Sequence, residues 1–292
     1  MKSRRFGAIA SALALSCTVV GLTAAHAGYA WQNPASSAST ARSATQKEPS
    51  ATSATIQRKP TASRTGKRSP EPLRVIAVGG SIALGWHDTG WHNWRHGWDG
   101  GYLVDAFHWL SRSTGHPYDF IDKAIVGADV KMVTSRYPEW LHQYEPSLVL
   151  LSWGLVNDIH VGTPLRLFEA EIRREISQAL ARHAVVFMVT PPVTEISQTA
   201  YKVPFHHFMA DELAVARSFH SPDVYIFNVF AQMKRYLTAH HQSYWPYVSN
   251  SWHPNHKGHT LAGHILYWDI RHRLGFEPAR FVPQPAKSRS AV

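Results

Sequence analysis

The sequence predicts an α/β protein, built as a three-layer α/β/α sandwich around a mostly parallel, five-stranded sheet. Short apolar runs alternate with longer amphipathic stretches through residues 73–280. Strands that are separated by helices form parallel sheets, and the helices then cover both faces of the sheet. A single core of about 200 residues is an ordinary size for one such domain.

The elements follow from the pattern of apolar residues along this region. The expected strands are the short apolar runs 74–78, 118–125, 147–152, 184–190 and 224–229. The expected helices are the amphipathic stretches 101–112, 130–143, 164–182, 205–219, 231–240 and 255–274. Within 164–182, for example, Ile172, Ile176 and Leu180 recur at helical spacing, with Glu and Arg on the other face.

The N-terminus has the three parts of a secretory signal peptide. Three basic residues within the first five positions precede an uncharged apolar stretch, and Ala25-His26-Ala27 follows it. A positive start, an apolar core and an A-x-A site predict cleavage after residue 27. The stretch is also just long enough to remain as an uncleaved membrane anchor. Cys17 fits a lipidation site poorly, because Ala14 is an unfavourable residue three positions before it.

Cys17 is the only cysteine of the chain. After cleavage of residues 1–27 the mature protein therefore has no disulfide, no thiol nucleophile and no cysteine metal site. An exported chain without disulfides is more typical of a bacterium than of a eukaryote.

Low-complexity segments flank the predicted domain. Residues 28–72 are rich in Ala, Ser, Thr, Lys, Arg and Pro, and they contain too little apolar surface to offset the entropy of ordering. They are expected to form a disordered linker, and residues 281–292 a disordered tail. The folded domain is thus expected over residues 73–280.

The net charge of +10 belongs to the ends of the chain and not to the domain. The signal, linker and tail carry +3, +5 and +2, which leaves residues 73–280 neutral. A neutral body gives no electrostatic argument for nucleic-acid binding. The basic linker can contact anionic cell-wall polymers or lipid headgroups, or it can serve only as a solubilising spacer.

Small and polar residues follow four of the expected strands. Ser81 follows the first strand, Gly127 the second, Gly154–Asp158 the third and Thr190-Pro191-Pro192 the fourth. Because the carboxyl ends of parallel strands meet in one crevice, we expect these residues to share one rim. The two glycines before Ser81 allow a sharp strand-to-helix turn that exposes its hydroxyl, as a nucleophile requires. The same pattern also fits an ordinary turn with Ser81 as the helix N-cap.

Four motifs then occur in a fixed order: Gly79-Gly80-Ser81-Ile82, Ala124-Ile125-Val126-Gly127, Gly154-Leu155-Val156-Asn157-Asp158 and Asn250-Ser251-Trp252-His253-Pro254-Asn255. In this order they resemble the four sequence blocks of the SGNH (GDSL) hydrolase family of esterases and lipases. The resemblance covers most of residues 74–274. It implies a flavodoxin-like fold and carboxylic ester hydrolysis, and we expect no cofactor.

The resemblance assigns a role to each motif. It implies that Ser81 is the nucleophile, that His253 is the general base, and that the amides of Ser81 and Gly127 form an oxyanion hole with Asn157. A serine needs such a base to attack, and donors fixed beside the developing negative charge stabilise it. The alternatives are a turn residue for Asn157 and a helix-start residue for His253.

Three departures from the family pattern affect these roles. Gly80 stands where the family usually has Asp, and one extra residue separates Gly154 from Asn157. Asn250 stands three residues before His253, where the family has Asp. An amide oxygen can accept the Nδ1 proton but stabilises an imidazolium less than a carboxylate does. The sequence therefore predicts a Ser–His dyad or an amide-assisted triad.

The 19 histidines of the chain raise the question of a metal site. His253, His256 and His259 are spaced by three, and His92 and His96 by four. Spacings of three and six rotate around a helix, and no Asp, Glu or Cys joins them, so we expect no metal site.

Four tryptophans are expected to contact substrate. Trp86 and Trp91 belong to a segment rich in Trp and His that directly follows the Ser81 motif, and Trp153 and Trp252 flank motif residues. Aromatic rings beside a catalytic serine can stack on sugar rings or shelter an acyl chain. The alternatives are a compact loop pinned by its own tryptophans and simple packing of the sheet edge.

These observations together predict an exported serine esterase. It would hydrolyse short acyl or acetyl esters, such as O-acetylated carbohydrate or lipid, through a Ser81 acyl-enzyme. One alternative is a non-catalytic or weakly active cell-surface carbohydrate-binding protein on the same fold, as Gly80 and Asn250 suggest. The other is an acyltransferase, which uses the same serine and excludes water.

Overall fold

The computed structural model describes residues 71–86 and 100–274. The described residues contain a parallel sheet in the order β2-β1-β3-β4-β5. Its strands are β1 (Leu73–Gly79), β2 (Tyr118–Asp122), β3 (Leu148–Ser152), β4 (Val185–Val189) and β5 (Val224–Phe227). The predicted fold class is confirmed. The predicted signal peptide, the predicted tail and residues 28–70 of the predicted linker lie outside the described residues.

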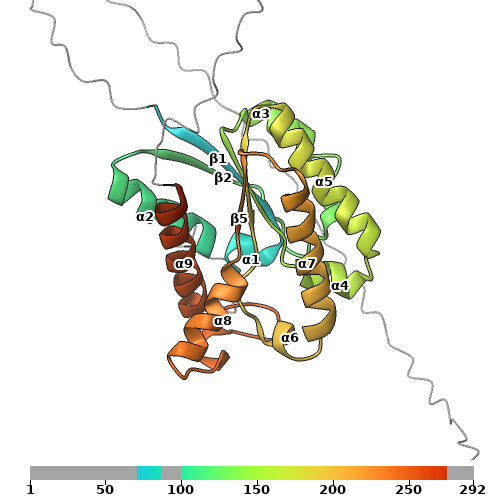
Figure 1. The fold of residues 1–292 in the computed structure, drawn as a ribbon, viewed down its shortest axis with the longest axis vertical. Coiled ribbons are helices and arrows are strands. Elements are labelled where there is room, and N and C mark those ends of the chain that lie inside the picture. Colours follow the sequence, from blue (N-terminus) through green and yellow to red (C-terminus); the bar gives the residue numbers. More distant parts are fainter. Residues whose placement is uncertain (1–70, 87–99, 275–292) are drawn as a thin grey trace, which may run out of the picture. The chain divides into compact units, whose positions relative to one another are not determined.

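Helices cover both faces of this sheet (Figure 1). Helices α2 (Tyr102–Thr114) and α9 (His256–Leu274) pack together on one face, and α8 (Val229–Ala239) packs against α9. Helices α3 (Tyr137–Tyr144), α5 (Leu165–Ala181) and α7 (Lys202–Ser218) lie on the other face. No helix within the described ranges has the length and apolar character needed to cross a membrane.

The three central strands explain why the apolar runs were so clear in the sequence. Every side chain of β3 and β4 is buried, as are all those of β1 except Arg74. Strands covered on both faces need apolar side chains at every position, and not only at alternate positions. The core of the domain therefore lies on both sides of β1, β3 and β4.

Three short helices lie at the rim, and the sequence indicated only the one that follows the glycine turn before Ser81. They are α1 (Ser81–Leu84), α4 (Val156–Val161) and α6 (Glu195–Gln198). Each has only four to six residues, which is too short to show helical periodicity. All three follow a strand at its carboxyl end, so they form the floor of the predicted rim.

The single helix that we expected over residues 130–143 is divided in two, and that prediction is wrong. A 3₁₀ turn, η2 (Val130–Val133), precedes α3. The Asp129 side chain accepts hydrogen bonds from the amides of Lys131 and Met132, which fixes the short turn. Pro138, in the first turn of α3, cannot donate a backbone hydrogen bond to a preceding turn, so a new helix begins there.

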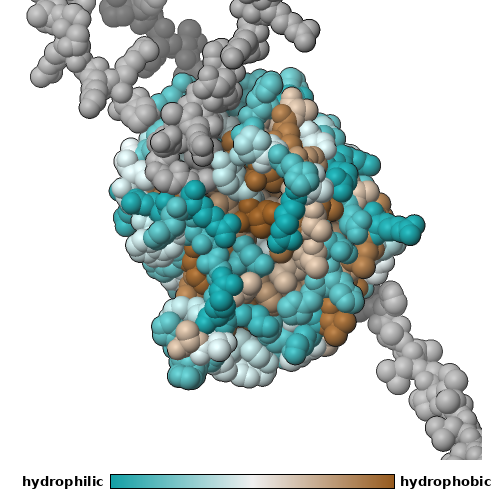
Figure 2. Space-filling view, in the orientation of Figure 1, coloured by the Kyte–Doolittle hydropathy of each residue, from teal (hydrophilic) through white to brown (hydrophobic). Residues whose placement is uncertain are grey.

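Strand β5 forms an edge of the sheet and is only partly covered. Figure 2 shows apolar surface between the two helical layers, where Figure 1 places this strand. Arg273, near the end of α9, donates to the Ile226 carbonyl at 2.7 Å and lies over the Phe227 ring. A charged side chain that occupies the edge carbonyls hinders pairing with a strand from another molecule.

The turn from β1 into α1 depends on a close approach of two backbones. A Cβ atom on Gly79 would lie 2.0 Å from the Ser152 carbonyl oxygen and 2.8 Å from the Ala83 Cβ. Gly79 also pairs with Ser152 in the register of β1 and β3. Only glycine therefore allows the two central strands to lie this close where they reach the rim.

We predict that Gly79→Ala lowers the free energy of unfolding by about 3 kcal/mol or more, because the new methyl group must displace backbone atoms. Urea titration checks this value. Gly154→Ala is the matched control, since its Cβ would meet only the end of Ile82 at 3.4 Å. Equal losses in the two variants would contradict the close-approach argument.

Candidate active site

Ser81 is the first residue of α1 and lies directly beyond the end of β1. It is buried, with 5% of its surface exposed. Its Oγ lies 2.8 Å from Nε2 of His253. The two ends of the domain therefore meet at one hydrogen bond between the two residues that the family resemblance pairs.

His253 is held in a closed loop between η3 (Trp245–Tyr247) and α9. A bridge between Val248 and Pro254 closes this loop, and the Ser249 amide donates to the His253 carbonyl at 3.0 Å. The Asn255 side chain donates to the carbonyls of Pro246 and Val248. These contacts fix the backbone on both sides of His253, so its ring is presented to Ser81 by a constrained turn.

Asn250 stands behind His253, in the position where the resemblance led us to look for Asp. Its Oδ1 accepts hydrogen bonds from the amides of Trp252 at 2.8 Å and His253 at 3.0 Å. The same oxygen lies 3.1 Å from Nδ1 of His253. Because the two amides can only donate, the oxygen and not the NH₂ group of Asn250 must face them. It follows that Nδ1 carries the proton and that Nε2 is free to accept one from Ser81.

Gly127 lies in a tight turn beyond β2. The Ala128 amide donates to the Ile125 carbonyl at 3.1 Å, and Gly127 has a φ of +76°. A positive φ at the third position is typical of a type II turn and favours glycine. A Cβ on Gly127 would meet nothing within 4 Å, so the backbone conformation and not the space accounts for glycine here.

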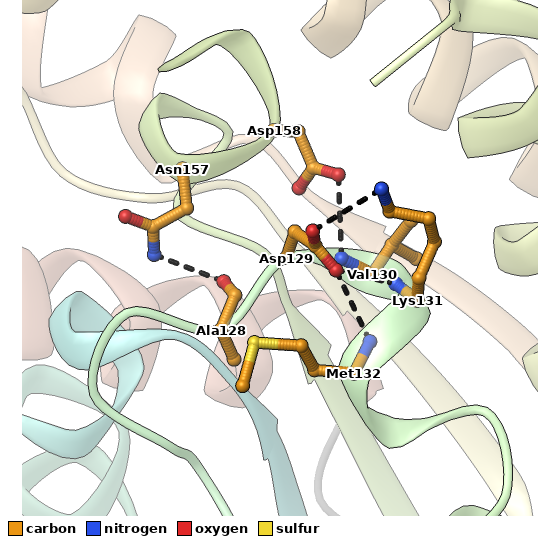
Figure 3. Close-up of polar contacts among 7 residues, drawn as sticks. All are labelled: Ala128, Asp129, Val130, Lys131, Met132, Asn157 and Asp158. Carbon is orange, nitrogen blue, oxygen red and sulfur yellow. Dashed lines mark hydrogen bonds and ion pairs between the residues drawn. The ribbon is translucent and has the colours of Figure 1, made fainter. Parts of the chain in front are cut away.

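The side chain of Asn157, from α4, reaches this turn (Figure 3). Its Nδ2 donates to the Ala128 carbonyl at 2.9 Å. The same nitrogen lies against Gly80, where a Cβ would be 3.2 Å away. The amide of Asn157 is thus fixed between the residue before Ser81 and the residue after Gly127.

The segment with the extra residue between Gly154 and Asn157 contains an unusual backbone conformation. Leu155 has a φ of +64°, although leucine strongly disfavours positive values. Its side chain is buried, with 1% exposed. Such a conformation costs about 1–3 kcal/mol and persists where the surroundings enforce it, often at functional sites. It lets α4 begin with Asn157 facing the turn after β2.

Asp158 connects α4 to the same loop by a second contact. Its Oδ1 accepts the Val130 amide at 3.3 Å, in parallel with the Asn157 contact (Figure 3). The carboxyl is only 1% exposed, and burial raises its pKa to about 6 against the opposing effect of the Val130 hydrogen bond. Asp158 therefore fixes the distance between α4 and the loop that carries Gly127.

Two further buried acids lie behind the site. Burial raises the pKa of Glu175 to about 8, and it raises that of Glu212 well above its ordinary value. Glu212 has no exposed surface, and neither of its carboxyl oxygens has a hydrogen-bond partner within the described residues. Asp158 contributes to both shifts through its nearby negative charge. The interior behind the rim thus favours neutral carboxyl groups.

Trp153 corrects one of our predictions. Its side chain is fully buried, and its Nε1 donates to Glu175 Oε2 at 3.0 Å. The prediction that Trp153 contacts substrate is wrong. Trp153 directly follows β3, but its side chain points into the core and donates a hydrogen bond to the buried Glu175 carboxyl group.

The Trp86 ring lies beside His253, Trp252 precedes His253 in the chain, and Trp91 is outside the described residues. The Trp86 ring centre is 6.4 Å from that of His253, and Trp252 is the preceding residue in the chain. Both tryptophans are half-buried. Contact of these two tryptophans with substrate stays a prediction.

Three residues at the site had no motif that could have revealed them. Tyr201 and His160 contact the Trp252 ring, at 6.0 Å and 5.1 Å between ring centres. His259 is buried, stacks on Tyr102, and has its Nε2 3.3 Å from the Trp86 carbonyl oxygen. The three histidines 253, 256 and 259 do not converge, and residues 71–86 and 100–274 contain no group of three metal-binding side chains.

Comparison with known families agrees with this geometry. The model of the GDSL-like Lipase/Acylhydrolase family matches residues 77–261. The chain belongs to this family. It is therefore a carboxylic ester hydrolase of the SGNH type, and the match spans all four motifs.

Solved structures show the same fold in other hydrolases. An acetylxylan esterase from Geobacillus stearothermophilus aligns with a TM-score of 0.55 and 15% identity, over 72% of this chain and 97% of that chain. A lipase/acylhydrolase from Enterococcus faecalis aligns with a TM-score of 0.55 and 15% identity, over 69% of this chain and 96% of that chain. A search of curated proteins found no match to this hydrolase.

We predict that Glu212→Gln makes the hydrolase relatively more stable as the pH rises. Below about pH 4 the carboxyl is neutral in both folded and unfolded states. At higher pH the unfolded chain loses this proton and the folded protein retains it, because its pKa is raised. The wild type then loses stability relative to the variant by up to about 1.4 kcal/mol per pH unit.

Urea titrations of both proteins between pH 4 and pH 8 measure this difference. The quantity to compare is the change with pH of the difference in unfolding free energy between the two proteins. A packing defect caused by glutamine adds the same free energy at every pH, so it does not affect this change. A difference that does not change with pH would show that the folded protein does not hold Glu212 neutral.

Proposed function

We propose that this hydrolase is an exported serine esterase that cleaves short-chain carboxylic esters through an acyl-enzyme on Ser81. The observation that carries the proposal is the 2.8 Å contact between Ser81 Oγ and His253 Nε2, with the Nδ1 atom directed at Asn250. Export rests on the signal-peptide pattern of residues 1–27.

In the first step, Ser81 Oγ attacks the ester carbonyl carbon. A new O–C bond forms, the electron pair of the carbonyl moves onto its oxygen, and the hydroxyl proton passes to His253 Nε2. The imidazolium then carries protons on both nitrogens. Asn250 Oδ1 keeps the Nδ1–H in place and partly stabilises the charge, as a neutral acceptor can.

The negative oxygen of this intermediate needs fixed donors. We assign this role to three groups: the Ser81 amide, which as the first residue of α1 has no partner within the helix, the Gly127 amide and Asn157 Nδ2. The contacts of Asn157 with Ala128 and Gly80 support this assignment. Donors held in place before the reaction stabilise the developing charge without reorganisation, and each contributes about 100- to 1,000-fold in rate.

The intermediate collapses when His253 returns its proton to the alkoxide oxygen of the leaving alcohol. The C–O bond to the alcohol breaks, and the acyl group stays on Ser81. A water molecule then attacks the acyl-enzyme, with Nε2 as its base, and the acid and free Ser81 are released.

Support for a short acyl group comes from related structures. The structures that align with this chain include an enzyme described as an acetylxylan esterase. Solved variants of that enzyme described as catalytic mutants replace a serine, an aspartate or a histidine, with the aspartate three positions before the histidine. Asn250 at the same spacing from His253 supports an amide-assisted version of the triad.

Two other functions fit the same fold. A carbohydrate-binding protein with little or no activity is suggested by Asn250, and an acyltransferase would use the same serine with an alcohol in place of water. Release of acetate from an ester in water separates hydrolysis from both of these alternatives.

We predict that Ser81→Ala lowers the rate of p-nitrophenyl acetate hydrolysis by about 10⁴-fold or more, because the acyl-enzyme can no longer form. Release of p-nitrophenol and of acetate is measured together. Ser177→Ala, on the exposed face of α5, is the matched control and keeps the wild-type rate. Equal rates for the Ser81 variant and the wild type would refute the esterase proposal.

We predict that Asn250→Asp preserves or raises kcat/KM. A carboxylate accepts the same three hydrogen bonds and stabilises the imidazolium more strongly than an amide. The acid limb of the kcat/KM profile should move to higher pH, since a nearby negative charge favours the protonated ring. Asn250→Ala, which removes the acceptor, should lose up to about 10⁴-fold.

Initial rates from pH 4 to pH 9 on the same ester test both changes. A large loss of activity in Asn250→Asp would contradict the role of Asn250 as the group that orients His253.

A further inference from the structure

Three aromatic side chains from separate segments meet at Trp252, the residue that precedes His253 in the chain. The ring centres of His160 and Tyr201 lie 5.1 Å and 6.0 Å from that of Trp252, both edge to face. The Tyr201 hydroxyl is 3.3 Å from Nδ1 of His160. We call Trp252, Tyr201 and His160 the aromatic wall. None of its members is fully buried, and His160 is exposed.

The fold fixes each member of the wall relative to the reaction centre. His160 lies in α4, one turn after Asn157, and Tyr201 directly precedes α7. The Ile196 amide donates to the Ser251 carbonyl at 2.8 Å, and the Tyr201 amide donates to the Ile196 carbonyl at 2.9 Å. The loop that carries His253 is thus connected through α6 to the residue that faces Trp252.

We propose that the aromatic wall is the binding subsite for the alcohol part of the ester, and that this alcohol is a sugar. The proposal rests on the Ser81 esterase function proposed above and adds the class of its leaving group. It assigns specificity to Tyr201 and His160, which belong to none of the four motifs.

The direction of proton transfer places the alcohol at this wall. His253 Nε2 must give its proton to the oxygen of the leaving alcohol, so that oxygen lies beside the His253 ring. The carbonyl oxygen lies instead at Asn157 Nδ2 and the Gly127 amide. Trp252 adjoins His253 in the chain, and the wall extends from it. The proposal therefore seats the group attached to the leaving oxygen at the wall, on the His253 side of the reaction centre.

The chemistry of the wall suits a sugar ring. A pyranose presents C–H groups on its faces, which pack on aromatic rings, and hydroxyl groups around its edge. The Tyr201 hydroxyl and the His160 ring nitrogens offer donors and acceptors next to the Trp252 ring. A long alkyl chain could not form hydrogen bonds with these polar groups. It would also exclude water from them, which is unfavourable for groups left without a hydrogen-bond partner.

Two acetate esters that differ only in the alcohol test this proposal. Acetylated xylobiose and ethyl acetate have the same acyl group, and ethyl acetate has no ring that can stack. We expect Trp252→Leu and Tyr201→Ala to lower the ratio of kcat/KM for acetylated xylobiose over ethyl acetate by roughly ten-fold, mainly through KM. Tyr201→Phe, which keeps the ring, should lower it less.

Trp268→Leu is the matched control, because Trp268 is an exposed tryptophan on α9 away from His253. It should leave both activities and their ratio at wild-type values. Acetate release measures all rates, and thermal unfolding confirms that each variant is folded.

Three results would overturn the proposal. If the wall variants lose activity on both esters equally, the wall only supports the His253 loop. If they change the preference between ethyl acetate and ethyl butanoate and not the sugar ratio, the wall contacts the acyl group. If the wild type and Ser81→Ala release acetate from both esters at the same rate, the esterase proposal itself fails, and the wall proposal fails with it.

Discussion

The hydrogen bond between Ser81 and His253 joins two residues that are 172 positions apart, and it depends on how the fold places each of them. Ser81 is placed by the close contact of Gly79 with Ser152, which brings β1 and β3 together at their carboxyl ends. His253 is placed by a loop that its own backbone hydrogen bonds close. A parallel sheet makes this meeting possible because its strands all end at the same edge.

A single amide oxygen organises the His253 side of the site. Asn250 Oδ1 accepts two backbone amides and also faces Nδ1 of His253, so it shapes the turn and selects the tautomer at the same time. An aspartate would add charge to this arrangement but would not change its geometry. The buried acids behind the rim show the same preference for neutral groups, since burial holds the carboxyl groups of Glu175 and Glu212 protonated more readily than in water.

The sequence predicted the sheet and the shared rim at its carboxyl edge because both follow from strand order, which apolar runs such as 148–152 make visible. The pairing of His253 with Ser81 came instead from the resemblance of the motifs to a known family. It could not predict the split at Pro138, because the periodicity continues through residues 130–143 while the Asp129 cap ends the first turn. The prediction for Trp153 failed because a residue that directly precedes a motif can point either toward the rim or into the core, and the sequence does not distinguish the two. Tyr201 and His160 were missed because only tertiary packing brings them to Trp252.

The left-handed backbone of Leu155 has a consequence for how this site can evolve. Helix α4 presents Asn157, Asp158 and His160 within little more than one turn, and their directions are all set by where the helix begins. If one residue before α4 were removed and the helix kept its place, each of these three side chains would move by one helical position, which is a rotation of about 100° around the helix axis. The hydrogen bond of Asn157 to Ala128, that of Asp158 to Val130 and the position of His160 in the aromatic wall therefore all depend on the rotation of α4 about its own axis. If Asn157 and His160 have the roles proposed above, a change in the start of α4 alters charge stabilisation and substrate recognition together.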